Sequence, residues 1–241
     1  MMRQQGRELM VTADQQAMKK AAAEKAVDEY VKDGMTVGLG TGSTAYFAIQ
    51  RVGQLVKQGH KLRCVATSRA TEEIAKECGI TIVQLDDVDH IDVTIDGADE
   101  VDPNLHLIKG LGGALLREKI VAAASILEVI VVDESKLVKH LGEKVPLPVE
   151  VVMYGHLRTA YALKRQGCEP ILRMKGSEPF VTDNGNNIYD CKFQQITSPF
   201  FLESAIDTIP GVVENGLFLN RAGAVIVSHS DGTVTELRHN D

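Results

Sequence analysis

Three carboxylates lie within five residues in the segment Asp96-Gly97-Ala98-Asp99-Glu100, directly after the apolar run 91–95. Ionised carboxylates only accept hydrogen bonds, so a group of them suits the hydroxyl groups of a sugar. An acidic surface turn is the alternative interpretation, and the spacing does not match a calcium-binding EF-hand loop. The segment therefore predicts either a site for hydroxyl groups or a solvated turn.

A cation and a carboxylate flank a glycine-rich turn further along the chain. Lys109 precedes Gly110-Leu111-Gly112-Gly113, and Glu118 follows in what we expect to be the second turn of a helix. Glycines allow the backbone to approach a ligand closely. A solvent-exposed Glu118 between two basic neighbours is the commoner arrangement, and the spacing alone does not decide between the two.

The segment Gly40-Thr41-Gly42-Ser43-Thr44 joins a predicted strand to a predicted helix. The first N–H groups of a helix lack partners within it, and together with the helix dipole they favour an anion such as phosphate. Ser43 and Thr44 add hydroxyl donors. Ala45 stands where a dinucleotide fingerprint needs glycine, and a Walker A loop would need a Gly-Lys pair. An ordinary turn with a Ser/Thr cap is the alternative.

Lys136, in Asp133-Glu134-Ser135-Lys136, follows a further predicted strand, although a lone lysine is more often solvated. All four segments thus come after strands, and in an open α/β sheet ligands bind at the carboxyl ends of the strands. Together they supply hydrogen-bond donors to a phosphate, hydrogen-bond acceptors for hydroxyl groups, two lysines and one carboxylate base. This set suits reversible proton transfer on a phosphorylated sugar without a cofactor.

An alternation of strands and helices must position these groups. We expect strands at residues 35–39, 62–66, 80–85, 91–95 and 129–132, and helices at residues 14–31, 45–57, 71–78 and 114–127. This order predicts an α/β fold with a doubly wound, mostly parallel sheet. In the last helix we expect Leu116 and Ile120 to face the core, with Glu118 on another face beside Ala122 and Ser125.

The pattern changes at Val145-Pro146-Leu147-Pro148, where two prolines favour extended chain and a boundary. Helices at 154–166 and 200–209, a strand at 171–174 and a hairpin turn at 183–186 predict a smaller α+β domain over residues 145–216. Residues 13–144 and 217–241 would form a Rossmann-like catalytic domain, to whose sheet 217–219 and 224–227 return. We expect residues 1–12 to be a disordered extension.

The composition excludes several classes of function. The 241 residues carry a net charge of −7 without a basic patch, which argues against nucleic acid as a partner. The four cysteines form no C-x-x-C pair and the seven histidines no cluster, so we expect reduced thiols and no metal. No apolar run approaches the roughly 20 residues that span a membrane, and residues 1–8 have no apolar segment typical of a secretory signal, so we expect a cytoplasmic protein.

The sequence resembles type A ribose-5-phosphate isomerases from about Asp14 to the C-terminus. The resemblance rests on seven motifs in family order. They are Gly40-Thr41-Gly42-Ser43-Thr44, Asp96-Gly97-Ala98-Asp99-Glu100, Lys109-Gly110-x-Gly112 with Leu116-Arg117-Glu118-Lys119, Asp133-x-Ser135-Lys136, Pro146-Leu147-Pro148-Val149-Glu150, Val181-Thr182-Asp183-Asn184-Gly185-Asn186, and Pro210-Gly211-Val212-Val213.

This resemblance implies interconversion of ribose 5-phosphate and ribulose 5-phosphate in the pentose phosphate pathway, without a cofactor, in a homodimer or homotetramer. It makes Glu118 the proton acceptor, and we expect Lys109 to stabilise an enediolate and Asp96 or Asp99 to move hydroxyl protons. It assigns substrate contact to Thr41, Gly42, Ser43, Thr44, Asp96, Gly97, Ala98, Asp99, Lys109, Gly110, Leu111, Gly112 and Lys136. Leu111 replaces an expected glycine and would be strained if its φ were positive.

Two other classes of function remain open at this stage. A non-catalytic sugar-phosphate sensor of similar fold could share the phosphate loop, although no DNA-recognition segment is visible in the sequence. A CoA transferase of similar architecture would use a glutamate as nucleophile. Turnover of ribose 5-phosphate without CoA would separate the isomerase from both.

Overall fold

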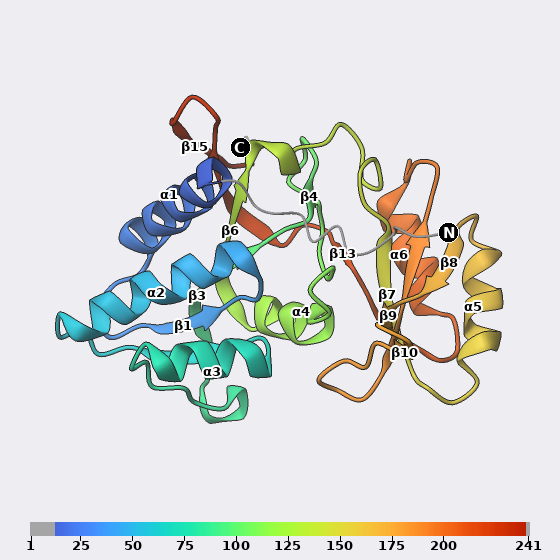
Figure 1. Cartoon of the computed structure of the whole chain (residues 1–241), viewed down its shortest axis with the longest axis horizontal. Helices are drawn as coiled ribbons and strands as arrows, with labels where there is room; N and C mark the ends of the chain where they lie inside the picture. Colours follow the sequence, from blue (N-terminus) through green and yellow to red (C-terminus); the bar gives the residue numbers. More distant parts are fainter. Residues whose placement is uncertain (1–12, 240–241) are drawn as a thin grey trace, which may run out of the picture.

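The computed structural model describes residues 13–239, and the predicted extension 1–12 lies outside them. Seen in Figure 1, the chain forms two units side by side. The helices are α1 Ala13–Tyr30, α2 Ser43–Lys57, α3 Arg69–Glu77, α4 Leu115–Ala123, α5 His156–Lys164 and α6 Pro199–Asp207. The strands are β1 Thr36–Leu39, β2 Arg63–Ala66, β3 Ile91–Gly97, β4 Glu100–Val101, β5 Leu107–Ile108, β6 Ser125–Asp133, β7 Leu147–Val151, β8 Glu169–Leu172, β9 Met174–Lys175, β10 Glu178–Pro179, β11 Asn187–Lys192, β12 Val212–Asn215, β13 Leu217–Phe218, β14 Ala222–Ser228 and β15 Val234–Leu237.

The larger unit contains a six-stranded sheet with the order β15-β14-β6-β3-β1-β2. All neighbours in it are parallel except β15, which runs antiparallel to β14. The predicted doubly wound, mostly parallel α/β sheet is therefore confirmed. Because β1 pairs with both β2 and β3, the strand order reverses at β1. The loops after β1 and β3 flank this reversal, which is where such sheets bind ligands.

The smaller unit is built on the antiparallel sheet β12-β7-β11-β8, with α5 and α6 packed around it. It has its own apolar core, which includes Leu147, Tyr189 and Ile206. The predicted turn at 183–186 is present, since residues 181 and 187 form a bridge across it. The boundaries of the predicted domain, 145 and 216, remain a prediction.

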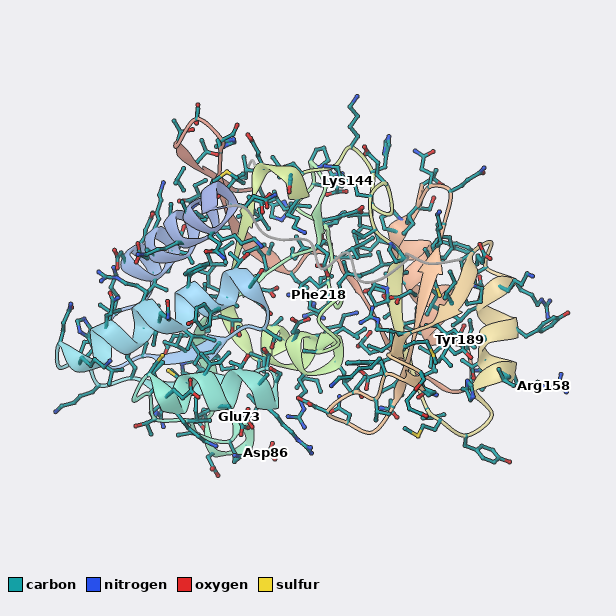
Figure 2. All side chains as sticks on the ribbon, viewed as in Figure 1. Glu73, Asp86, Lys144, Arg158, Tyr189 and Phe218 are labelled. Atoms are coloured by element: carbon teal, nitrogen blue, oxygen red, sulfur yellow. The ribbon has the colours of Figure 1, made fainter. Side chains whose placement is uncertain are left out.

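The end of the chain only partly rejoins the main sheet as expected. Strand β14 lies beside β6, as predicted for residues 224–227. Strand β13, by contrast, pairs with β5 in a separate three-stranded sheet, β13-β5-β4. This small sheet shares an apolar core with β6 and β14 of the larger unit. Phe218 of β13 lies at the centre of the molecule in Figure 2.

Two predicted elements are wrong. Residues 80–85 form no strand, only a bridge between Cys64 and Ile82. The helix predicted over 114–127 ends at Ala123, because residues from Ser125 onward pair with β3. Its buried face is also different, since Ile120 is exposed while Glu118 and Val121 are buried. The contacts of β6 between β3 and β14 outweigh the helical propensity of this stretch.

Helix α4 is held in place by a buried lysine. The Nζ atom of Lys119 lies 2.7 Å from Glu214 Oε1 and donates to the carbonyl oxygen of Asn215, also at 2.7 Å. It also lies 5.0 Å from the centre of the Phe218 ring. These contacts tie α4 to β12 and β13, so the helix that carries Glu118 is fixed between the two units. Within residues 13–239, no helix is long and apolar enough to cross a membrane.

Candidate active site

A small cavity lies where the loops after β1, β3 and β5 meet the start of α4. Its volume is about 100 Å³, and an adjoining cavity of about 600 Å³ shares five of its lining residues. The smaller cavity is lined by Lys19, Thr41, Gly42, Ser43, Thr44, Gly97, Ala98, Asp99, Lys109, Gly110, Gly112, Glu118 and Lys136. The structure therefore brings together every predicted site residue except Asp96, which lies just behind this wall, and Leu111.

Asp96 is the last residue but one of β3, and it holds the first turn of the 40–44 loop. Its Oδ1 accepts hydrogen bonds from the N–H of Thr41 at 3.1 Å and of Gly97 at 2.7 Å. A side chain at position 40 would be impossible here, because its Cβ would lie 2.1 Å from Asp96. Burial is the main cause that raises the pKa of Asp96, and Lys109 opposes the rise.

Lys109 is the centre of a buried ion cluster. Its Nζ lies 3.0 Å from Asp96 Oδ2 and 3.5 Å from Glu118 Oε1, and it donates to the carbonyl oxygen of Gly97. The side chain is only 2% exposed. Burial alone would lower the pKa of Lys109, but the surrounding carboxylates raise it above its ordinary value. Lys109 is therefore a fixed positive charge at the cavity wall.

Glu118 lies in the first turn of α4, not the second, because the helix begins at Leu115. Its side chain is buried, and Oε2 has no hydrogen-bond partner among the described residues. Burial is the largest cause that raises the pKa of Glu118, to about 8, with Lys109 acting in the opposite direction. A carboxylate with a pKa near neutrality, open to a cavity on one side, has the properties of a general base.

Asp99 is hydrogen-bonded to the glycine turn at the cavity wall. Asp99 Oδ2 accepts a hydrogen bond from the N–H of Leu111 at 2.9 Å. Gly110 has a φ of 102°, a conformation that favours glycine, whereas Leu111 is not among the residues with positive φ. Leu111 therefore carries no strain of the kind considered above. The nearby Glu100 is buried and structural, because it accepts hydrogen bonds from backbone N–H groups of the 142–145 loop.

The start of α2 presents the N–H groups and side chains expected of a phosphate site. Ser43 and Thr44 open the helix, and the cap residue Gly42 provides no side chain to occupy its N–H groups. The hydroxyl of Thr41 is used within the fold, where it lies 2.7 Å from that of Thr67. Thr41 therefore shapes the loop, and Ser43 and Thr44 are the side chains left to meet a ligand.

Two residues near the site were not predicted from the sequence. Lys19 on α1 donates from Nζ to Ser43 Oγ at 2.9 Å and lines the cavity with Lys136, so two cations flank the 40–44 loop. Glu128 of β6 is buried, and neither carboxylate oxygen has a hydrogen-bond partner among the described residues. The only sequence signal for Glu128 is a charge at the start of an apolar strand.

Glu128 adds negative charge to the cluster around Lys109. Burial raises the pKa of Glu128 to about 7, and Lys109 opposes the rise. Glu128 in turn is one of the like charges that raise the pKa of Glu118. Among residues 13–239, no group of three His, Cys, Asp or Glu side chains is placed to hold a metal ion. Around Lys109 the carboxyl groups of Asp96, Glu118 and Glu128 outnumber the lysine.

We expect the pH dependence of turnover to follow the ionisation of Glu118. A base acts in its deprotonated form, so kcat/KM should rise with pH up to about 8 and then level. In Glu128→Gln one like charge is lost, the pKa of Glu118 falls, and the rise should occur at lower pH. Profiles of kcat/KM against pH for wild type, this variant and a control, Glu73→Gln on the exposed face of α3, measure the shift. An unchanged profile in Glu128→Gln would contradict the role of Glu128.

Comparison with known proteins agrees with this geometry. The family model of ribose 5-phosphate isomerase A (phosphoriboisomerase A) matches residues 63–232. A ribose-5-phosphate isomerase A from Bacillus mycoides is 48% identical over 216 residues, which cover 89% of this chain and 97% of that protein. One from Gloeobacter violaceus is 52% identical over 220 residues, covering 91% of this chain and 95% of that protein.

Solved structures are similar over nearly the whole chain. Ribose 5-phosphate isomerase from Plasmodium falciparum superposes with a TM-score of 0.91 at 41% identity, covering 94% of this chain and 100% of that one. A D-ribose-5-phosphate isomerase in complex with phospho-erythronic acid superposes with a TM-score of 0.89 at 43% identity, covering 92% and 98%. The similarity thus extends over both units.

Proposed function

This chain belongs to the ribose 5-phosphate isomerase A family and is a ribose-5-phosphate isomerase, and we propose that Glu118 is the base that moves the proton in its reaction. The enzyme interconverts D-ribose 5-phosphate and D-ribulose 5-phosphate, a step of the pentose phosphate pathway. The aldehyde at C1 becomes an alcohol while the alcohol at C2 becomes a ketone. The substrate is reduced at one carbon and oxidised at the next, so no external redox partner takes part.

The observation that carries the proposal is the contact of Glu118 with Lys109 at the cavity wall, 3.5 Å between Oε1 and Nζ. Glu118 takes the proton from C2 of the open-chain aldose, giving an enediolate, and returns it to C1. Lys109, whose side chain is buried at the cavity wall, stabilises the negative oxygen of this intermediate with its charge. Its contact with Asp96 holds the ammonium group in place.

The remaining groups bind the two ends of the sugar. Asp99 faces the cavity with a carboxylate that can accept from hydroxyl groups and move their protons, which also opens the furanose ring. The phosphate is bound by the N-terminal end of α2, the hydroxyls of Ser43 and Thr44, and the cations Lys19 and Lys136. Binding of a sugar phosphate by a relative supports this assignment, since one was solved with phospho-erythronic acid.

We further propose that the enzyme works in the cytoplasm as a homodimer or homotetramer. Three large apolar side chains, those of Tyr154, Leu157 and Tyr161, are exposed at and along α5, which supports packing between copies. A non-catalytic sensor is disfavoured, because binding a sugar phosphate does not require a buried carboxylate whose pKa is raised to about 8. The proposal for the site therefore remains that of an enzyme.

Turnover after metal removal tests the cofactor-free mechanism. The protein dialysed against EDTA should convert ribose 5-phosphate to the ketose at the rate of the untreated protein, because the proposed groups are side chains alone. Ketose formation is followed with and without added divalent metal. Loss of activity that one metal restores would overturn the metal-free mechanism, and binding of ribose 5-phosphate without any turnover would support the sensor.

A further inference from the structure

We propose that Arg173 of the smaller unit is a positioning residue for Asp99, and that it acts through the peptide group between Gly110 and Leu111. Arg173 lies between β8 and β9, outside the cavity and more than 60 residues along the chain from the turn it contacts. Its Nη1 donates to the carbonyl oxygens of Gly110 and Leu111, both at 3.0 Å. The inference rests on the proposed role of Asp99 in the isomerase reaction.

The peptide group between Gly110 and Leu111 makes a hydrogen bond on each side. The carbonyl oxygen of Gly110 accepts from Arg173, while the N–H of the same peptide, which belongs to Leu111, donates to Asp99 Oδ2 at 2.9 Å. A hydrogen bond to a carbonyl polarises its peptide group and strengthens the bond that its N–H donates. The guanidinium therefore fixes the orientation of the peptide and, through it, that of the Asp99 carboxylate.

Arg173 is itself locked by neighbours in its own unit. Its Nε donates to Asp190 Oδ2 at 2.9 Å, and Nη2 donates to Oδ1 of the same carboxylate. The guanidinium carbon lies 5.8 Å from the centre of the Phe180 ring. The side chain is 12% exposed, so this two-pronged pair with Asp190 is largely shielded from water. These contacts leave the Arg173 side chain few rotamers, as its role as a positioning residue requires.

Gly110 makes such a support necessary. Its φ of 102° lies in a region that glycine enters without strain, but glycine also leaves the backbone free to choose other conformations. Within the part of the chain that the structure describes, the turn 110–113 has one internal backbone hydrogen bond, from Gly113 N–H to Gly110 O at 3.0 Å. Arg173 supplies two further bonds, and so the smaller unit sets the shape of a turn that belongs to the catalytic cavity.

Arg173→Met keeps the length of the side chain and removes its donors, and we expect kcat to fall by up to about 100-fold from misplacement of the catalytic groups. A double-mutant cycle with Asp99→Asn gives the decisive readout. If Arg173 acts through Asp99, the double variant is no slower than Asp99→Asn alone, whereas two independent effects multiply. Multiplying effects, or a wild-type kcat in Arg173→Met, would overturn the proposal.

Amide hydrogen exchange tests the same link without turnover. Exchange at the Leu111 N–H should be faster in Arg173→Met than in wild type and unchanged in Arg158→Met, a control on α5, where Arg158 points away from the molecule in Figure 2. Equal exchange in all three proteins would contradict the proposal even if the isomerase assignment holds. If Arg173→Met does not fold, Arg173→Lys replaces it in both experiments, because lysine keeps the charge but not the two-pronged hydrogen bonding of the guanidinium.

Discussion

Glu118→Gln should lower kcat by about 10²- to 10⁴-fold, the usual contribution of general-base catalysis. This loss corresponds to roughly 3–5 kcal/mol of activation free energy at 1.36 kcal/mol per decade. The amide keeps the size of the side chain but cannot accept the C2 proton. KM should change little, because the phosphate and hydroxyl groups are bound by other residues. Initial rates of ketose formation over a range of ribose 5-phosphate concentrations measure both constants.

The matched control is Glu73→Gln, which makes the same chemical change on the exposed face of α3. Its kcat should equal that of wild type, since substitutions at solvated positions away from a site usually change stability by less than about 0.5 kcal/mol. If Glu118→Gln resembled this control, Glu118 would be a purely structural residue, and Asp96 or Asp99 would have to supply the base.

Glu118→Gln should also change the stability of the protein, and measuring that change shows whether the variant is folded. Folding raises the pKa of Glu118 from 4.5 to about 8, so the folded protein holds a proton that the unfolded chain releases between these values. Glu118 therefore destabilises the fold progressively as pH rises through this window. Glu118→Gln should be at least as stable as wild type near pH 8, which thermal unfolding measures.

Lys109→Met is expected to have the second large effect. Removing one donor to an oxyanion costs about 10²- to 10³-fold in kcat. Removing one partner of a buried ion cluster also destabilises a fold by about 3–5 kcal/mol. Because Lys109 opposes the rise in the pKa of Glu118, its loss should raise that pKa further and move the rise of kcat/KM to higher pH. This shift is opposite in sign to that expected for Glu128→Gln.

Stability and activity of Lys109→Met must be measured against pH. The buried carboxyl groups take up protons at low pH, so the variant should be most stable there and lose stability as pH rises. Circular dichroism identifies the pH range in which it is folded, and kcat is compared with wild type within that range. A folded Lys109→Met with the kcat of wild type would remove Lys109 from the mechanism.

The sequence was most informative where chemistry-bearing residues directly follow strands. Asp96 and the 40–44 loop lie at the ends of β3 and β1, and the order of elements requires these ends to share one edge of the main sheet. The prediction of a common site was therefore possible before any contact was known. Lys109 follows β5, which belongs to the separate three-stranded sheet, so its place beside Asp96 does not follow from this rule. The predicted end of the helix that carries Glu118 was wrong, because the Ala- and Leu-rich residues around 114–127 favour helix, while pairing with β3 makes residues 125–127 part of β6.

Other features of the site depend on contacts between segments far apart in the chain. Lys19 reaches Ser43 only because α1 packs on α2 and β6. Arg173 contacts Leu111 across 62 residues, through the docking of β8 and β9 beside the glycine turn. No local pattern distinguishes these two side chains from the other basic residues, most of which are solvated. Glu128 is similar, since its burial depends on its neighbours in the sheet.

Exchange of the C2 hydrogen with solvent tests the identity of the base most directly. Ribose 5-phosphate incubated in D2O with wild-type enzyme should acquire deuterium at C2, and the ketose at C1, because the proton taken by a carboxylate can be replaced from solvent before it returns. With folded Glu118→Gln, deuterium should enter C2 at least about 100-fold more slowly, in parallel with the loss of isomerisation. NMR of the recovered aldose measures the rate. Incorporation at C2 at the wild-type rate in Glu118→Gln would show that another group removes the proton.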